Sequence, residues 1–252
     1  MTSRTKLDLP RFFFDPSDRR GDRVVLRGEE FSHVRARRVR RGDTVALLDG
    51  SGKEYEGRVQ DIGRKEAVVE IVGVEEPPRE TALRIVLVQA VLAPPRVDLL
   101  VEKATELGVA EIRLFTSERT VVAPSKARLQ RWRRIAREAA KQSGRLLVPT
   151  VGEPLPYEEV LERTARETPA RFLLHPEGDP FSPEPPPGAD LAFFVGPEGG
   201  FTSGEVRRAR EAGLRVVRLG PRRLRAETAA IVAVALAELL WGDFLARGTP
   251  PP

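Results

Sequence analysis

Short apolar segments separated by glycine-bearing turns fill the first part of the chain. Each has the length of a strand, and Gly50-Ser51-Gly52 is typical of a hairpin turn. The expected strands are 24–26, 44–49, 54–62 and 67–72, with a short helix and a loop over 29–41. This spacing predicts a small β-barrel domain over residues 1–73.

After residue 81 the pattern changes to strands that alternate with helices. A proline-containing linker over 75–81 precedes this region. The expected strands are 83–91, 111–115, 171–175, 191–195 and 216–219. The expected helices are 94–108, 125–144, 157–167, one that follows Thr202, and 226–245. Strict alternation predicts an α/β domain over residues 74–252, with a parallel sheet that carries helices on both faces.

Individual helices carry further signals. Five apolar positions share one face of the helix over 94–108: Val97, Leu100, Val101, Ala104 and Leu107. Gly108 is a natural stop for this helix. Thr202 and Glu205 have the spacing of a capping box. The segment 177–188 contains five prolines and is expected to be a loop.

Composition narrows the possible classes of protein. The chain has 252 residues and is 40% hydrophobic, which suits one large or two smaller domains with a real core. It has no cysteine and only two histidines, so disulfides and thiolate metal sites are excluded, and we expect no metal. The N-terminus lacks an apolar signal region, and the longest apolar run, 229–237, is too short for a bilayer. We therefore expect a soluble, cytoplasmic protein with no membrane partner.

Positive charge is gathered in blocks, although the net charge is only +5. The blocks are 33–41, 126–145 and 207–225, and each is rich in arginine or lysine and poor in acids. Three such blocks predict a polyanionic partner, most naturally a nucleic acid. The alternative is that they are solvated faces of an arginine-rich protein.

Two glycine-bearing turns near the C-terminal end carry the strongest chemical signal. The segments 196–201 and 219–228 each follow a short apolar run and precede an expected helix. Glycine has no Cβ, so such turns let backbone groups approach a ligand closely. Because the second turn also carries three arginines, we predict a small-molecule pocket beside an anion-binding surface. Neither a P-loop nor a Gly-x-Gly-x-x-Gly motif is present.

Both turns resemble the C-terminal motifs of the RsmE-type methyltransferases, members of the SPOUT class that methylate N3 of a uridine in small-subunit ribosomal RNA. Other matching segments occur in the same order along the chain: Arg11-Phe12-Phe13, His33 before a run of arginines, 102–109, 117–119, 137–145 and 174–177. One position departs from the pattern, since Arg223 stands where isoleucine is expected. The similarity covers essentially the whole chain.

This resemblance implies several features that the residues alone do not. The N-terminal domain is expected to be a PUA-like RNA-binding barrel, and the C-terminal SPOUT domain to contain a deep trefoil knot. S-adenosylmethionine (SAM) is the implied methyl donor. The implied assembly is a homodimer with pockets at the subunit interface, and the implied partner is ribosomal RNA or the small ribosomal subunit.

The cofactor is expected in a cleft formed by three loops. The implied cofactor-binding residues are Leu174, His175, Pro176, Gly196, Pro197, Glu198, Gly199, Gly200, Leu219, Gly220, Leu224, Arg225, Glu227, Thr228 and Ala229. For catalysis we consider Arg225 as the group that stabilises a uracil imidate, and Glu198 and Glu227 as orienting groups, with Glu198 also a possible base. The alternative for both glutamates is that they cap or brace the turns through backbone N–H groups.

The residues implied to bind RNA lie in the basic blocks and the matching segments: Arg11, His33, Arg35, Arg37, Arg38, Arg119, Arg128, Arg131, Arg134, Lys141 and Arg145. His33 can stack on a base, or can be a structural histidine satisfied within its loop.

Two other functions compete with base methylation. One is a non-enzymatic RNA-binding ribosome-assembly factor, and the other is a SPOUT methyltransferase that modifies the ribose 2′-oxygen.

Overall fold

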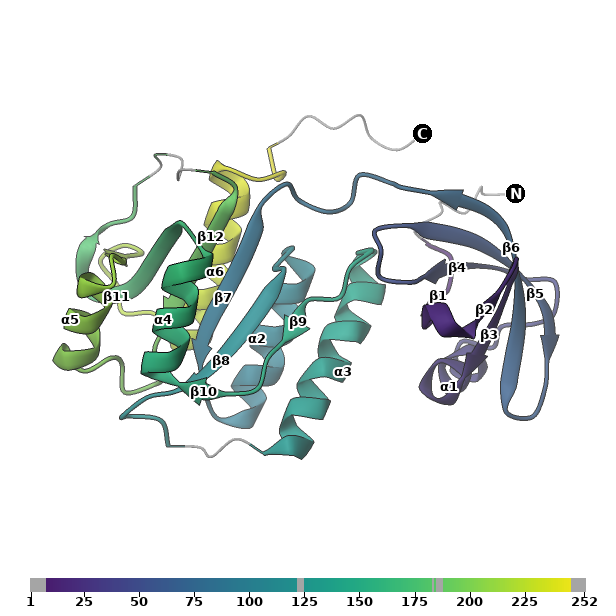
Figure 1. Ribbon diagram of the computed structural model, residues 1–252, viewed down its shortest axis with the longest axis horizontal. Coiled ribbons are helices and arrows are strands. Elements are labelled where there is room, and N and C mark those ends of the chain that lie inside the picture. The colour runs from purple at the N-terminus through teal and green to yellow at the C-terminus, as the bar shows by residue number, and fades with distance from the viewer. Residues whose placement is uncertain (1–7, 122–124, 183, 185–187, 246–252) are drawn as a thin grey trace. The chain divides into compact units, whose positions relative to one another are not determined.

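The computed structural model describes residues 8–121, 125–182, 184 and 188–245, and Figure 1 shows its ribbon. The packing of the chain divides it into two compact units. The first unit is Met1–Glu80 together with Ala140–Val148, and the second is Thr81–Ala139 together with Pro149–Pro252. The segment Ala140–Val148 thus groups with the first unit, whereas a division at residues 73 and 74 leaves it in the second.

The first unit is built on a six-stranded mixed sheet. Its strands are β1 (Arg11–Phe13), β2 (Arg19–Arg20), β3 (Arg23–Arg27), β4 (Thr44–Leu48), β5 (Glu54–Ile62) and β6 (Glu66–Glu75). They lie in the order β1-β4-β5-β6-β3-β2, antiparallel throughout except for the parallel pair β1 and β4. The short helices η2 (Pro16–Asp18) and α1 (Gly28–Ala36) complete the unit. The predicted β-rich first domain is confirmed.

Alternation of side chains forms the core of this sheet. On β3, Val24 and Leu26 are buried, and the residue between them is more exposed. Val45 and Leu47 of β4 enter the same cluster as Phe31 of α1, so the sheet buries one face against the helix. Because strand periodicity fixes which residues face inward, the sequence predicts these four strands closely.

The second unit is a seven-stranded sheet in which all the strands are parallel. Its strands are β7 (Arg84–Ala90), β8 (Glu111–Thr116), β9 (Thr150–Val151), β10 (Leu155–Pro156), β11 (Ala170–Pro180), β12 (Asp190–Val195) and β13 (Arg215–Arg218). The order is β10-β8-β7-β12-β11-β13, and β9 pairs with β8. β12 therefore lies between β7 and β11, two strands that precede it in the chain.

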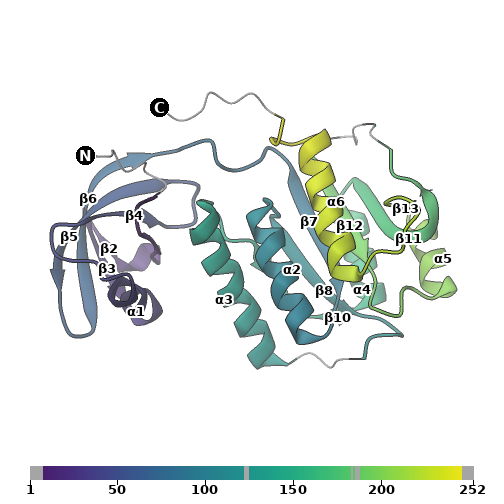
Figure 2. The same cartoon turned by 180° about the vertical axis from the view of Figure 1, so that it is seen from behind.

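Helices cover both faces of this sheet, as predicted. They are α2 (Pro94–Glu106), α3 (Lys126–Ser143), α4 (Tyr157–Glu167), α5 (Ser203–Glu211) and α6 (Ala226–Leu240). Figures 1 and 2 show α4 and α5 on one face, and α2, α3 and α6 on the other. Val86 and Val88 of β7 pack in one cluster with Tyr157 of α4 and Ala209 of α5. The apolar face of α2 predicted from its periodicity is buried except for Leu107, which is half-buried.

A bulge in β11 is the most important departure from the predicted elements. The pairing of β11 with β13 shifts between Leu174 and Asp179, so both residues lie opposite Val217. The strand continues to Pro180, so the prediction of a loop from residue 177 is wrong for 177–180; residues 183 and 185–187 of that loop lie outside the described part. A Cβ on Gly178 would lie 2.6 Å from the backbone nitrogen of Val217. Only glycine therefore fits at the point where β11 pairs with β13 again after the bulge.

Two other boundaries differ. β6 runs to Glu75, so the predicted linker begins later. Helix α6 ends at Leu240 rather than at residue 245, because the chain turns back at Gly242 and the Asp243 N–H donates to the Glu238 carboxylate (3.3 Å). The short strands β1, β2, β9 and β10 were not predicted, since two or three residues carry no periodicity.

The capping box at α5 gives a stability prediction. The Thr202 hydroxyl accepts from the Glu205 N–H (3.2 Å), and the Glu205 carboxylate accepts from the Thr202 N–H (2.7 Å). We expect Thr202→Ala to lower the free energy of unfolding by about 1 kcal/mol, because one helix donor loses its partner. Denaturant titration measures this, and Ser203→Ala, at the next and exposed position, is the matched control. Equal stability of the two variants would contradict the prediction.

Candidate cofactor and RNA site

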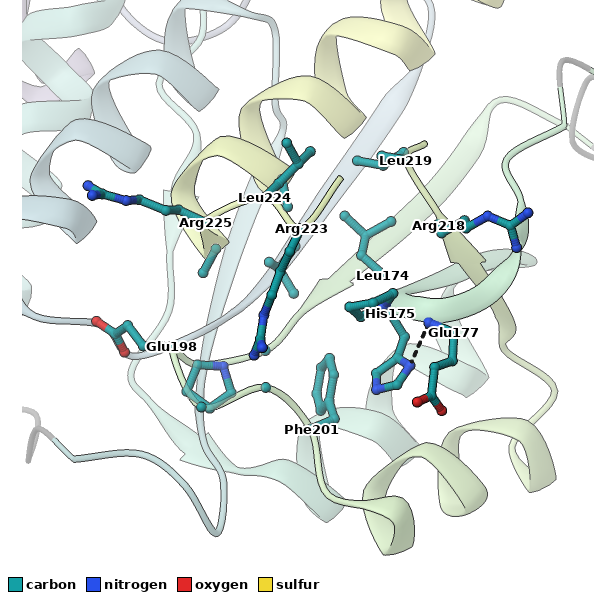
Figure 3. Close-up of a pocket in the computed structure, with 18 of the residues that line it drawn as sticks. Leu174, His175, Glu177, Glu198, Phe201, Arg218, Leu219, Arg223, Leu224 and Arg225 are labelled. Carbon is teal, nitrogen blue, oxygen red and sulfur yellow. Dashed lines mark hydrogen bonds between the residues drawn. The ribbon is translucent and has the colours of Figure 1, made fainter. Parts of the chain in front are cut away.

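A cavity of about 640 Å³ opens at the bulge of β11 and the carboxyl ends of β12 and β13. Its walls come from the β11 bulge (174–177), the loop after β12 (196–201) and the loop after β13 (218–225), as Figure 3 shows. Ligands of open α/β sheets bind in this place, outside the carboxyl ends of strands whose connections run in opposite directions. The volume is typical of a small-molecule pocket.

Gly220 gives the second loop its shape. Its φ of +99° lies in the region that residues with a Cβ avoid, and Pro221 then restricts the chain before the arginines. The backbone thus turns sharply at the end of β13 and continues into α6. The two glycine turns predicted from the sequence do meet in one cavity.

The apolar part of the cavity has two sides. Leu174, Leu219 and Leu224 gather on one of them, and the Phe201 ring lies on the other (Figure 3). Phe201 stacks on Phe115 with ring centroids 6.1 Å apart and an interplanar angle of 9°. This stacking fixes the loop after β12 to the core, so the cavity wall is preformed.

Three charged groups join the loops beside the cavity. The Arg96 Nη1 donates to Oε1 of Glu198 (2.9 Å), and the Ala93 N–H donates to the same oxygen (3.2 Å). The Arg96 Nε lies 3.8 Å from Oε1 of Glu227. Arg96 therefore connects the start of α2, the loop after β12 and the first turn of α6. Oε2 of Glu227 is buried and accepts no hydrogen bond from the described residues.

His175 lies at the edge of the cavity on the β11 bulge. Its Nδ1 accepts from the Glu177 N–H (3.3 Å), a contact drawn as a dashed line in Figure 3. In a neutral imidazole this places the proton on Nε2. His175 thus presents an N–H donor at the cavity edge.

Comparison with known proteins matches this architecture. The profile of the RNA methyltransferase domain matches residues 79–238, and that of the RNA methyltransferase PUA domain matches residues 26–72. The chain belongs to the RNA methyltransferase family. The first profile alone spans more than half of the chain, and it contains every segment that lines the cavity.

Relatives confirm the predicted RsmE-type resemblance. Ribosomal RNA small subunit methyltransferase E of Mycobacterium tuberculosis is 32% identical over 244 residues, covering 91% of this chain and 91% of that protein. The enzyme of the same name from Bacillus subtilis is 30% identical over 235 residues, covering 86% and 92%. A crystal structure of the Neisseria gonorrhoeae methyltransferase E bound to S-adenosyl methionine superimposes with a TM-score of 0.88 at 34% identity, covering 94% and 99%.

Most of the residues predicted to bind the cofactor do line the cavity of this methyltransferase. They are Leu174, His175, Pro176, Gly196, Pro197, Glu198, Gly199, Gly200, Leu219, Gly220, Leu224, Arg225 and Ala229. Glu227 and Thr228 are not among the lining residues. Glu227 instead lies behind the wall, within reach of Arg96.

The arginines around the cavity differ in what they contact. Arg119, predicted to bind RNA, donates to the Gly199 carbonyl (2.8 Å) and supports the glycine loop. Arg218 donates to the Gly178 carbonyl (2.6 Å). In Figure 3 the Arg223 side chain reaches toward the loop after β12, whereas that of Arg225 points away from Leu174 and His175.

Three of the residues predicted to bind RNA are buried. Arg11 pairs with Glu54, Lys141 with Glu30 (2.8 Å), and Arg145 with Glu80 (2.7 Å). A buried, ion-paired cation does not reach a phosphate, so for these three positions the structure argues against the predicted contact. Their role is to hold the first unit together.

The other RNA candidates lie nearer the surface. His33 is half-buried, with Lys141 Nζ 3.3 Å from its Nδ1 and the Phe12 ring against its edge, which favours the structural role for this histidine. Arg131 donates twice to Asp98 (2.8 and 3.0 Å) and so connects α3 to α2. Of the remaining candidates Arg128 is half-buried, and the others are exposed: Arg35, Arg37, Arg38 and Arg134. Arg37 lies within reach of both His33 and Gln142.

The sequence interpretation missed several residues of the cavity. Arg96 carries a signal that could have found it, because a cation in the first turn of a helix is unfavourable unless an anion elsewhere holds it. Phe201 stood in a recognised motif but received no role. Three other lining residues, Arg218, Arg222 and Arg223, belong to the basic block 207–225. The sequence does not show which side chains of this block face a cavity.

The described part of the chain has neither a membrane span nor a metal-binding cluster. None of its helices combines the length and the apolar character needed to span a membrane. Its His, Cys, Asp and Glu side chains form no group of three or more able to hold a metal ion.

Proposed function

We propose that this methyltransferase transfers a methyl group from S-adenosylmethionine to N3 of a uridine in small-subunit ribosomal RNA. The observation that carries the proposal is the cavity built by two glycine loops at the carboxyl ends of β12 and β13. A relative with the same fold along almost the whole chain binds S-adenosyl methionine. The small-subunit methyltransferases among its relatives support the choice of RNA.

The residues present fit this cofactor. Adenine is flat and apolar with polar edges, and Leu174, Leu219 and Leu224 offer apolar surface beside the exposed backbone of the glycine loops. The Nε2–H of His175, at the cavity edge, would serve a polar group of the ligand. When bound, the cofactor supplies an electrophilic methyl group on a sulfonium.

The chain's own residues have to prepare the acceptor. N3 of uracil is a poor nucleophile until its proton leaves, and a guanidinium stabilises the anion that results. We assign this role to Arg225, which lines the cavity at the N-cap of α6. Because Arg96 and the Ala93 N–H both donate to Oε1 of Glu198, we assign Glu198 to bracing the loop rather than to proton removal.

Gly220→Val tests the placement of the cofactor. Valine at φ +99° is strained by roughly 1–3 kcal/mol, and relief of that strain reshapes the loop after β13. We expect SAM affinity to fall about tenfold or more, as measured by calorimetry. Gly188→Val is the control, because Gly188 also has a positive φ of +91° but does not line the cavity. Undiminished affinity of the Gly220 variant would remove this loop from the cofactor site.

We also propose a homodimer, the deep trefoil knot and a cytoplasmic location where ribosomes are assembled. An apolar stripe on α6 supports the dimer: Leu239 and Leu240 are exposed, and Ile231, Val232 and Leu236 are half-buried. A helix that is apolar all round favours burial. Sedimentation of Leu239→Glu, Leu240→Glu protein tests this, with monomer expected for the variant and dimer for the wild type.

The deciding experiment is methyl transfer from labelled SAM to small ribosomal subunits that lack the modification, followed by nucleoside analysis. A 3-methyluridine product would support both the reaction and the substrate. A 2′-O-methylated product would replace base methylation by ribose methylation. No transfer and no SAM binding would favour a non-enzymatic assembly factor.

A further inference from the structure

The cavity carries far more positive charge than a methyl donor needs. Six arginines and two glutamates line it, a formal excess of four positive charges: Arg96, Arg119, Arg218, Arg222, Arg223, Arg225, Glu177 and Glu198. S-adenosylmethionine is itself cationic at its sulfonium and amino groups. Since like charges repel, the excess indicates a second, anionic ligand at the same opening.

Only some of these arginines are paired with other groups of the protein. Arg96 pairs with Glu198, while Arg119 and Arg218 donate to backbone carbonyls. Arg222, Arg223 and Arg225 form no ion pair and no side-chain hydrogen bond with the residues that the structure describes. Several other arginines of this unit do have an acidic partner, such as Arg84 with Glu111 and Arg208 with Glu158. The loop after β13 therefore presents a concentrated set of cations that the fold leaves for a ligand.

The side chains of Arg223 and Arg225 point in different directions. Arg223 reaches across the cavity toward the loop after β12, and Arg225 points away from it (Figure 3). Pro221 restricts the backbone immediately before Arg222 and Arg223, so this part of the loop is less flexible than a tail. A pair of arginines held at the rim of a cavity is suited to two neighbouring phosphates.

We propose that Arg222 and Arg223 form a phosphate clamp that binds the RNA backbone on either side of the target nucleotide. This inference rests on the proposed function, and it assigns the RNA contact to two residues outside the predicted RNA-binding set. N3 of uracil is the central donor of a Watson–Crick pair, so the target uridine must be unpaired when the methyl group arrives. Holding the flanking phosphates at the rim keeps a splayed-out base directed into the cavity.

The same guanidinium groups could instead bind the carboxylate of the cofactor, and the two ligands predict different effects. Phosphate contacts release counterions, so each one adds about 0.7 to the slope of log K against log salt concentration for single-stranded RNA. A carboxylate contact changes SAM affinity and leaves the RNA slope unchanged. The variant Arg222→Gln, Arg223→Gln separates these cases, because glutamine keeps a polar side chain on an exposed loop.

The experiment measures binding of labelled oligouridylate between roughly 50 and 200 mM salt, together with SAM binding by calorimetry. For the double variant we expect a slope smaller by about 1.4 and unchanged SAM affinity. Arg207→Gln is the matched control, since Arg207 is exposed on α5 and pairs with Glu211 away from the cavity. Equal thermal unfolding of the three proteins confirms that the loop changes leave the fold intact.

An unchanged slope would overturn the clamp, and so would a slope change no larger than that of the Arg207 variant. Lost SAM affinity with an unchanged slope would assign the pair to the cofactor carboxylate. Failure of the proposed function is distinguishable from these results. In that case wild-type protein would form no 3-methyluridine on small subunits, whatever the salt slope of the double variant.

Discussion

Replacing Arg96 with methionine is expected to lower kcat for methyl transfer about a hundredfold while the protein stays folded. Arg96 donates to Glu198 and faces Glu227, so it holds the loop after β12 and the first turn of α6 in one arrangement. Without the cation the two carboxylates repel each other and the loops around the cavity move apart. A misplacement of about 1 Å in an active site costs on the order of a hundredfold in rate. Single-turnover methyl transfer at saturating SAM and RNA measures the loss.

Arg163→Met is the matched control for this prediction. Arg163 pairs with Glu111 and Glu167 at the surface of α4, so the same change removes an ion pair that does not touch the cavity. We expect its kcat to equal that of the wild type, and Arg96→Lys to lie between the two. A wild-type kcat for Arg96→Met would show that the connection among the three segments has no part in catalysis.

Replacing Glu54 with glutamine is expected to destabilise the first unit by about 3–5 kcal/mol, because it removes the carboxylate that pairs with buried Arg11 and half-buried Arg79. Glu54 is only 5% exposed, and Arg11 beside it is 6% exposed. Both Nη atoms of Arg79 also donate to this carboxylate (2.6 and 3.3 Å). Hydrogen exchange of the amides in β4, β5 and β6 reports on this unit alone. Glu66→Gln, which breaks the exposed pair with Arg27, is the control and should cost at most about 1 kcal/mol.

The same ion pairs predict how the effect depends on pH. Burial raises the pKa of Glu54, but the hydrogen bonds and charges of Arg79 and Arg11 outweigh it, so the net pKa is lowered from 4.5. A carboxylate with a lowered pKa stabilises the folded state above its unfolded pKa and loses that contribution as the pH falls through the folded value. The difference between wild type and Glu54→Gln should therefore be full at pH 7 and shrink below about pH 4.5. A difference that is constant down to pH 3 would contradict this account.

Local signals predicted much of the fold. The alternation in β3 and β4, the apolar face of α2 and the capping box at Thr202 and Glu205 all depend on residues within a few positions of one another. The two glycine turns likewise predicted the cavity, since each lies between an apolar run and a helix. What these patterns share is that the residues causing the structure are neighbours in the chain.

The features that escaped prediction depend on distant residues. The bulge at 175–178 exists because β13 pairs with β11 on both sides of it, and no pattern within β11 encodes that register. Arg96 acts through Glu198, which is 102 positions away. Lys141 belongs to a basic block that suggests a solvent-facing or RNA-facing helix, yet it is buried against Glu30. Charge in a sequence shows how many cations are present, but it does not show which of them already have a partner.

The position of β12 between two earlier strands also determines the order in which the protein can mature during synthesis. β7 is complete at residue 90, but the neighbour that covers its inner edge ends at residue 195. At roughly 5–20 residues per second, the ribosome takes about 5–20 s to produce the intervening chain. Throughout that interval one edge of β7 lacks its partner for the backbone N–H and C=O groups, which makes it a site for incorrect strand pairing. The strand that closes the sheet also leads directly into the first glycine loop, so a nascent chain gains its cofactor cavity only after its sheet is complete.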